Sequence, residues 1–197
     1  MKTFPRLFAV ALCVISFGFT QALAATSATG GSKNVPSGLS FSYDAQHDQI
    51  SASGVHALTM PSTPTIPPTT GTITITINIH LVTHFRHHTA IHCSLAAAGG
   101  QIDQVNLGIN GGIETISDIA KESSSGWATC TLTIPYSWTL PPDPEAVSGL
   151  VLAFGASARQ HESQEDPLVE RSTLQIEGVG PLPANGATTT FTFDVAL

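Results

Sequence analysis

The chain has 197 residues, of which 42% are hydrophobic, and its formal net charge is −7 at pH 7. A chain of this length can bury a core of its own. Its acidic balance argues against nucleic acid or anionic lipid as a partner, because both are bound through basic patches. Composition and charge therefore predict a globular protein that does not bind nucleic acid.

The N-terminus has the pattern of a secretory signal peptide. Lys2 and Arg6 precede an apolar run at residues 7–19, and residues 22–24 (Ala-Leu-Ala) supply the small side chains that a signal peptidase recognises. The apolar run is too short to cross a bilayer of about 30 Å as a helix. We therefore predict a signal peptide over residues 1–24, no transmembrane segment, and a mature protein that is secreted or periplasmic.

Residues 25–70 are rich in Ser, Thr, Gly and Pro and lack an apolar period. The prolines between residues 61 and 68 have no amide proton to give to a central strand and favour an extended chain. We expect a tether or a loosely packed arm here, although the short alternation at residues 39–43 would fit a strand at a sheet edge. Residues 71–197 are then expected to form one domain.

The clearest pattern begins at residue 72. Up to residue 81, Ile or Leu alternates with Thr, Asn or His, which is the period of a half-buried strand. Residues 90–98 alternate again, and the polar residues 84–88 are short enough to close a hairpin between the two. A register with His80 opposite His92 and His84 opposite His88 keeps every isoleucine of the first strand on the inner face.

Further strands are expected from short alternations or apolar runs. They are residues 104–109, 113–119, 127–138, 147–158, 173–179 and 190–197. Asn110-Gly111-Gly112 is typical of a turn, and residues 140–144, 159–172 and 180–186 are expected to be loops. About seven or eight strands separated by turns predict an all-β fold, an immunoglobulin-like antiparallel β-sandwich.

Cys93 and Cys130 are the cysteines that remain after the predicted cleavage. An even number in an exported chain predicts one disulfide. Both lie on the apolar side of their expected strands, so the bridge should join the inner faces of two stacked sheets. Closing this loop stabilises the fold by about 4 kcal/mol in the chain-entropy model.

The expected hairpin gathers four histidines on its solvent-facing side, namely His80, His84, His88 and His92. Opposed side chains in such a pair have Cβ atoms about 4.5–5.5 Å apart, and neutral imidazole binds zinc or copper. The hairpin contains no acid that could orient the rings. The metal site therefore competes with a solvated strand face whose histidines gain charge together near about pH 6.

The remaining polar clusters and aromatic residues are expected to be structural. The acids of residues 162–170 lack the spacing of a calcium loop. Tyr136 and Trp138 share the parity of Cys130 and should lie in the core, which leaves Trp127 as a surface aromatic. The sequence has no nucleophile elbow, zincin motif, phosphate-binding loop or free mature cysteine. An enzyme is therefore not expected.

Two segments carry a resemblance to other proteins. They are residues 128–138 (Ala-Thr-Cys-Thr-Leu-Thr-Ile-Pro-Tyr-Ser-Trp) and residues 183–190 (Pro-Ala-Asn-Gly-Ala-Thr-Thr-Thr). With them the chain resembles a group of uncharacterised secreted proteins of Gram-negative bacteria over about residues 71–197, and this resemblance implies secretion but no activity. The signal, the alternating strands and the disulfide loop also resemble those of chaperone–usher pilins, which implies a subunit that assembles into a pilus.

The sequence thus favours a non-catalytic binding or structural module outside the cytoplasm. Its ligand is unknown, and its partner is expected to be a protein or another component of the cell envelope. Two alternatives stay open: a zinc or copper binder that uses the four histidines, and a pilus-like assembly subunit. Apart from such a metal, no cofactor is implied.

Overall fold

The computed structural model describes residues 35–57, 68–82, 85, 89–124, 126–139, 147–160 and 168–197. Within these ranges no helix is long and apolar enough to cross a membrane, because all regular structure there is strand. The strands are β1 (Ser40–Asp44), β2 (Gln49–Ser53), β3 (Val55–His56), β4 (Thr69–His80), β5 (Thr89–Asp103), β6 (Gly108–Ile119), β7 (Lys121–Ser124), β8 (Trp127–Trp138), β9 (Ser148–Gln160), β10 (Leu168–Gly180) and β11 (Ala187–Ala196). The prediction of an all-β protein is confirmed.

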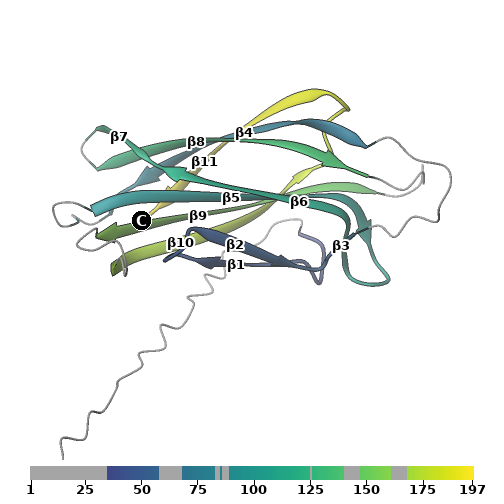
Figure 1. Ribbon diagram of the computed structural model, residues 1–197, viewed down its shortest axis with the longest axis horizontal. Helices are drawn as coiled ribbons and strands as arrows, with labels where there is room; N and C mark the ends of the chain where they lie inside the picture. The colour runs from purple at the N-terminus through teal and green to yellow at the C-terminus, as the bar shows by residue number, and fades with distance from the viewer. Residues whose placement is uncertain are drawn as a thin grey trace, which may run out of the picture.

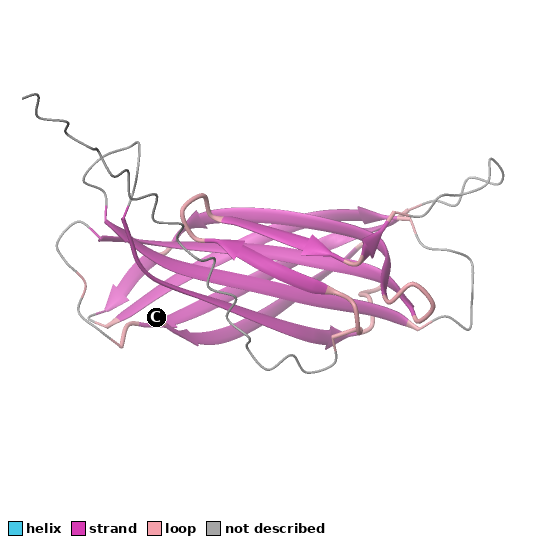
Figure 2. Ribbon diagram, turned by 90° about the horizontal axis from the view of Figure 1, so that it is seen from below, coloured by secondary structure: helices cyan, strands magenta, loops and turns pink. Residues whose placement is uncertain are grey.

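The strands form three layers (Figure 1). A four-stranded sheet in the order β11-β4-β8-β7 faces a five-stranded sheet in the order β10-β9-β5-β6-β3. The hairpin of β1 and β2 lies on the far side of the five-stranded sheet. Figure 2 shows that the long strands of both sheets run along the longest axis of the molecule.

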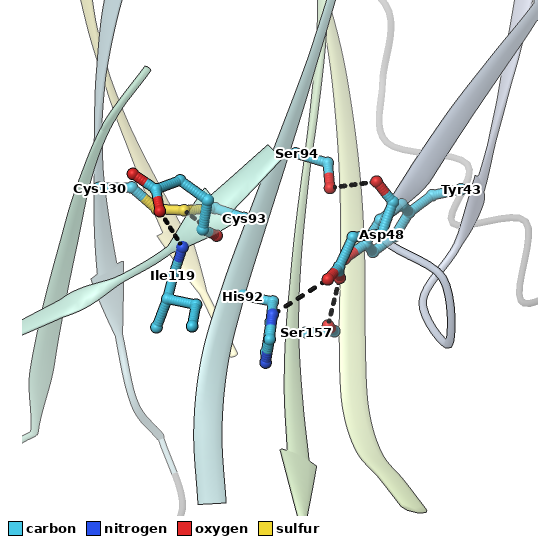
Figure 3. The surroundings of a disulfide bond; sticks show 9 residues. Tyr43, Asp48, His92, Cys93, Ser94, Ile119, Cys130 and Ser157 are labelled. Atoms are coloured by element: carbon cyan, nitrogen blue, oxygen red, sulfur yellow. Dashed lines mark hydrogen bonds and ion pairs between the residues drawn. A yellow bond between two sulfur atoms is a disulfide. The ribbon is translucent and has the colours of Figure 1, made fainter. Parts of the chain in front are cut away.

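The main core lies between the two large sheets and takes every second residue of each facing strand. Its fully buried members include Ile73, Ile75, Ile77 and Ile79 of β4, Leu95 of β5, Leu132 of β8, and Leu152 and Phe154 of β9. Cys93 of β5 and Cys130 of β8 form a disulfide within this core (Figure 3), as predicted. The bridge ties one sheet to the other across a sequence separation of 37 residues.

The neighbours of β4 differ from the prediction. β4 lies between β8, which is antiparallel, and β11, which is parallel, whereas β5 lies in the other sheet between β6 and β9. The expected β4–β5 hairpin is therefore wrong. Alternation specifies which face of a strand is buried, but it does not specify which strand lies beside it. The parallel pairs β11–β4 and β3–β6 also make both sheets mixed, where purely antiparallel sheets were expected.

The turn between β5 and β6 was predicted in the wrong place. It lies at residues 104–107, where the Asp103 carboxylate accepts hydrogen bonds from the backbone N–H groups of Asn106 (2.8 Å) and Val105 (2.9 Å) and where Leu107 has φ 55°. These hydrogen bonds lower the pKa of Asp103 to about 2, and the bond from the Asn106 backbone makes the largest contribution. Asn110-Gly111-Gly112, the expected turn, instead lies inside β6.

The glycines of this region make room for an aromatic ring. Gly99 of β5 is paired with Gly112 of β6, and a Cβ atom on either would come within 2.0 or 2.3 Å of the Trp138 side chain. Trp138 in turn stacks on Tyr136, with 4.4 Å between ring centroids. Both aromatic residues are buried, which confirms their predicted place in the core.

The far side of the five-stranded sheet is buried by residues that were expected to form an arm. Tyr43 and Ile50 of the β1–β2 hairpin pack against Ala96, Ala153 and Leu174. β9 is consequently buried from residue 149 to residue 160, as is typical of a strand covered on both faces. Within residues 39–56 the chain is therefore packed against the domain, in contrast to the loose arm that its Ser- and Gly-rich composition suggested.

Candidate functional site

The structure separates the two described histidines of the predicted metal site. His80 ends β4 on the outer face of the four-stranded sheet, where its ring stacks on Trp127 with 4.6 Å between centroids. His92 lies in β5, on the side of the five-stranded sheet that faces the hairpin, with its Nδ1 atom 3.0 Å from Asp48. The exposed position of Trp127 agrees with its predicted role as a surface aromatic.

The expected constellation of four imidazoles is therefore wrong in its geometry, because His80 and His92 lie on different sheets. His84 and His88 lie outside the described residues. Among the residues that are described, no group of three or more His, Cys, Asp or Glu side chains is placed to hold a metal ion. His47 lies in the segment that was predicted to be an arm, and its Nδ1 atom forms a hydrogen bond with the Asp44 carboxylate at 2.7 Å.

A first candidate site is a buried polar cluster around Asp48. The β1–β2 turn brings Asp48 over the five-stranded sheet in a left-handed conformation (φ 54°), which Asp adopts more readily than most residues. Its carboxylate contacts the Arg159 guanidinium and His92, and Ser157 donates to it at 3.5 Å. Figure 3 shows His92, Ser94 and Ser157 pointing from the sheet toward Asp48.

Backbone groups of the turn complete this cluster. Ser94 donates a hydrogen bond to the backbone oxygen of Asp48 at 2.8 Å, and Arg159 donates to that of Gln46 at 2.5 Å. Ser94, Ser157, His92 and Arg159 are all less than 9% exposed. A buried charge needs such partners, because desolvation without them costs several kcal/mol.

The cluster has the composition of a catalytic triad but not its arrangement. In a triad the serine hydroxyl is bonded to the imidazole, and the carboxylate bonds to the other ring nitrogen. Here the hydroxyl groups of Ser94 and Ser157 are bonded to Asp48 itself, one to its backbone and one to its carboxylate. These hydrogen bonds fasten the hairpin to the sheet.

Tyr43 closes the same contact from the hairpin side. Its hydroxyl donates to Asp48 at 3.3 Å, and burial raises its pKa to about 12. Next to it a hollow of about 480 Å³ opens between the hairpin and β6. The hollow is lined by residues 47–51, Leu95 and residues 115–117, and no buried polar group that lacks a partner points into it.

The second candidate site is the outer face of β11, β4 and β8. Each of these strands carries the pattern Thr-x-Thr-x-Thr, at residues 188–192, 72–76 and 129–133. Because the buried residues take the alternate positions, all nine threonines lie on the outer face. The pairing of the strands arranges them in rows across the sheet.

We call the three central rows the threonine face. They are Thr188–Thr72–Pro135, Thr190–Thr74–Thr133 and Thr192–Thr76–Thr131. Within the middle row the hydroxyl groups of Thr74 and Thr133 lie 3.2 Å apart in a hydrogen bond. The next row contains Asp194, which accepts a hydrogen bond from Asn78 at 2.9 Å. The threonine face itself contains no ionisable side chain.

No protein-family model matches this chain, and searches of curated proteins and of solved structures find no significant match.

Neither candidate site was identified from the sequence. The Asp48 cluster had one signal: Ser157 and Arg159 lie at the end of an apolar run, and a polar residue in a strand covered on both faces requires a partner. The threonine face had another signal, because the pattern Thr-x-Thr-x-Thr occurs in three of the strands. Alternation identifies the inner face of each strand, whereas the threonine face becomes apparent only when the outer residues of all three strands are considered together.

Proposed function

We propose that the protein is a non-catalytic module that acts outside the cytoplasm and binds an extended, repetitive surface through the threonine face. The observation that carries this proposal is the alignment of threonines from three strands into rows. The predicted signal peptide supports a location outside the cytoplasm. A module of two stacked sheets with an inter-sheet disulfide also fits the proposed immunoglobulin-like class.

The shape of the surface favours an extended ligand over a small molecule. Small molecules are held in concave pockets lined by converging groups, whereas the threonine face is the outside of a sheet. Its repeat matches a ligand that presents the same group many times.

The threonine side chains are ordered before any ligand binds. β4 is paired on both sides, and its isoleucines are fully buried beneath the rows. Threonine is branched at Cβ, so few rotamers are open to it. Little side-chain entropy is therefore lost on binding, and many weak contacts can add up.

The predicted zinc or copper site and the predicted pilus-like subunit have no comparable support. The first would need His80 and His92 on one face, and they lie on two. For the second, no described groove is matched to a donor strand. The four-histidine site is therefore not proposed, and the pilus-like subunit stays a prediction.

The proposal can be tested by co-sedimentation of the mature, disulfide-bonded protein with insoluble repetitive materials. Ice, cellulose, chitin and peptidoglycan are suitable probes. Thr133→Lys places a charge in the middle row, and Thr115→Lys makes the same change at an exposed strand position on the other sheet. We expect at least one material to retain the wild type and Thr115→Lys but not Thr133→Lys. Retention of Thr133→Lys to the same extent, or of no variant by any material, would contradict the proposal.

A further inference from the structure

We propose that the surface bound by the threonine face is ice. This inference rests on the proposed function above and narrows it to one ligand. Three properties of the face carry it: its two-dimensional repeat, the chemistry of its side chains and its lack of charge.

The repeat is close to that of a crystal face of ice. Neighbouring strands lie about 4.7–4.9 Å apart, and alternate residues on one strand lie about 6.6–6.8 Å apart. The rows therefore form a nearly rectangular grid. Hexagonal ice presents repeats of similar size, also at right angles, on its prism faces. Threonines of β11, β4 and β8 can then occupy equivalent positions along both directions of one lattice.

Threonine supplies two groups that suit such a lattice. Its hydroxyl group can both donate and accept a hydrogen bond, so it can take the place of a water molecule. Its methyl group is apolar and favours release of liquid water from the contact. Both groups are held at fixed positions because the side chain has few rotamers.

The charge of the face matches that of ice. The chain has a formal net charge of −7 and fourteen acidic residues, yet the three rows contain none of them. The nearest carboxylate in the described rows is Asp194, in the adjoining row, where it is bonded to Asn78. An ionised side chain binds liquid water strongly and would oppose its transfer into a crystal. A neutral face is therefore complementary to a neutral lattice.

The same face is less suited to a crystalline polysaccharide. Flat sugar surfaces are bound by aromatic rings that stack on the sugar rings, because such rings supply a large contact area at low entropy cost. No aromatic residue occurs in the three rows. Trp127 lies beyond them, opposite His80, and its ring is stacked on that histidine.

The twist of the sheet limits how well the threonine face matches a flat ice lattice, and therefore how strongly the protein is expected to act on ice. Adjacent strands are rotated by about 20–25° relative to each other, so three strands follow a flat lattice only over a small area. We expect the protein to shape growing ice crystals and to slow their recrystallisation, with a small depression of the freezing point.

The test uses ice as the probe and the mature, disulfide-bonded chain. Ice recrystallisation and crystal shape are compared for the wild type, Thr133→Lys and Thr115→Lys, after circular dichroism has shown equal folding. We expect Thr133→Lys to raise the concentration needed for inhibition at least about tenfold, equivalent to about 1.4 kcal/mol. Thr115→Lys should be unchanged.

The other outcomes distinguish failure of the ice inference from failure of the proposed function. Failure of the wild type to alter ice growth would overturn this inference. If the same protein is then retained by a polysaccharide in a manner that Thr133→Lys abolishes, only the choice of ice is wrong and the proposed function stands. If it is retained by no surface, both are wrong. Inhibition that is equal in Thr133→Lys and the wild type would also overturn the inference, because it would place ice binding elsewhere on the molecule.

Discussion

The two large sheets of this protein are made from the same kind of strand, but the outer face of one is exposed and the outer face of the other is covered. The threonine face, on the outside of the four-stranded sheet, is open to solvent and contains no ionisable side chain. The far side of the five-stranded sheet is covered by the β1–β2 hairpin, and its polar side chains are buried around Asp48. The comparison indicates that polar residues stabilise the fold on the covered face, whereas those of the open face are exposed and form the surface that we propose for binding.

This difference has a clear origin in the strands. β4 and β8 alternate large apolar residues with threonine, which suits a sheet with one wet face. β5 and β9 carry alanine and glycine toward the hairpin, and these small side chains allow it to approach closely. Changes at the buried positions of the covered face should therefore cost stability, whereas changes on the open face should cost binding.

The largest effect is expected from Asp48→Asn. It retains a residue that accepts the left-handed conformation but leaves the Arg159 charge buried without its carboxylate. Breaking a buried ion pair costs about 3–5 kcal/mol. We expect a loss of this size in the free energy of unfolding, measured by urea denaturation.

Asp44→Asn is the matched control on the same hairpin. Asp44 pairs with His47, but both side chains are more than half exposed. Solvent screening limits an exposed pair of this kind to about 0–1 kcal/mol. Equal losses for the two variants would contradict the view that burial at Asp48 is what fastens the hairpin.

The second effect is a loss of stability at alkaline pH through Tyr43. Burial raises its pKa from 10.0 to about 12 in the folded protein. Between these values the unfolded chain releases the proton and the folded chain keeps it, so folding becomes less favourable as pH rises. The full loss is about 3 kcal/mol, from about 1.36 kcal/mol per pKa unit, and none of it should be present below about pH 9.

The measurement is urea denaturation as a function of pH, with Tyr43→Phe as the control. Burial also raises the pKa of Tyr136, so the variant should retain a smaller alkaline loss. A pH dependence identical to that of the wild type would show that Tyr43 is not buried against the five-stranded sheet.

A smaller loss is expected from Gly155→Ala. A Cβ atom on Gly155 would lie 2.9 Å from the Tyr43 ring, so the hairpin would have to shift. Overpacking of this kind costs about 1–3 kcal/mol. Thermal unfolding of Gly155→Ala, alone and combined with Tyr43→Ala, would check the cause. If the added methyl group is as costly without the Tyr43 ring as with it, the clash lies elsewhere.

The smallest effect on stability is expected on the open face. Thr133 is exposed, and its main contact is the solvent-exposed hydrogen bond to Thr74. A cross-strand pair of this kind contributes about 0.2–1 kcal/mol. Thr133→Lys should therefore unfold at nearly the same urea concentration as the wild type. A loss as large as that of Asp48→Asn would mean that the threonine rows are structural, and the contrast between the two faces would disappear.

Much of the four-stranded sheet could be predicted from the sequence. The alternation at residues 127–138 predicted β8 with its observed bounds, and the parity of Cys93 and Cys130 predicted a bridge between inner faces. Alternation succeeds here because it reports burial directly. It reports nothing about neighbours, so β4 was paired with β5, whereas its partners β8 and β11 begin 47 or more residues after β4 ends.

The covered face was harder to predict for physical reasons. The hairpin contributes few large apolar residues, and much of its attachment comes from Asp48, whose partners His92 and Arg159 are distant in sequence. The turn before β6 was predicted in the wrong place because its hydrogen bonds are accepted by Asp103, outside the expected turn. Gly112, in the segment that resembles a turn, instead makes room for the Trp138 ring. Contacts of this kind are set by the folded arrangement and leave little local pattern.

The most direct test of the threonine face is to see where the protein binds on a single ice crystal. The mature chain would be fused to a fluorescent protein and allowed to adsorb while the crystal grows slowly. We expect fluorescence on a defined set of crystal planes for the wild type and for Thr115→Lys, and none for Thr133→Lys. Exclusion of the wild-type fusion from the ice, or the same labelled planes with Thr133→Lys, would contradict the account.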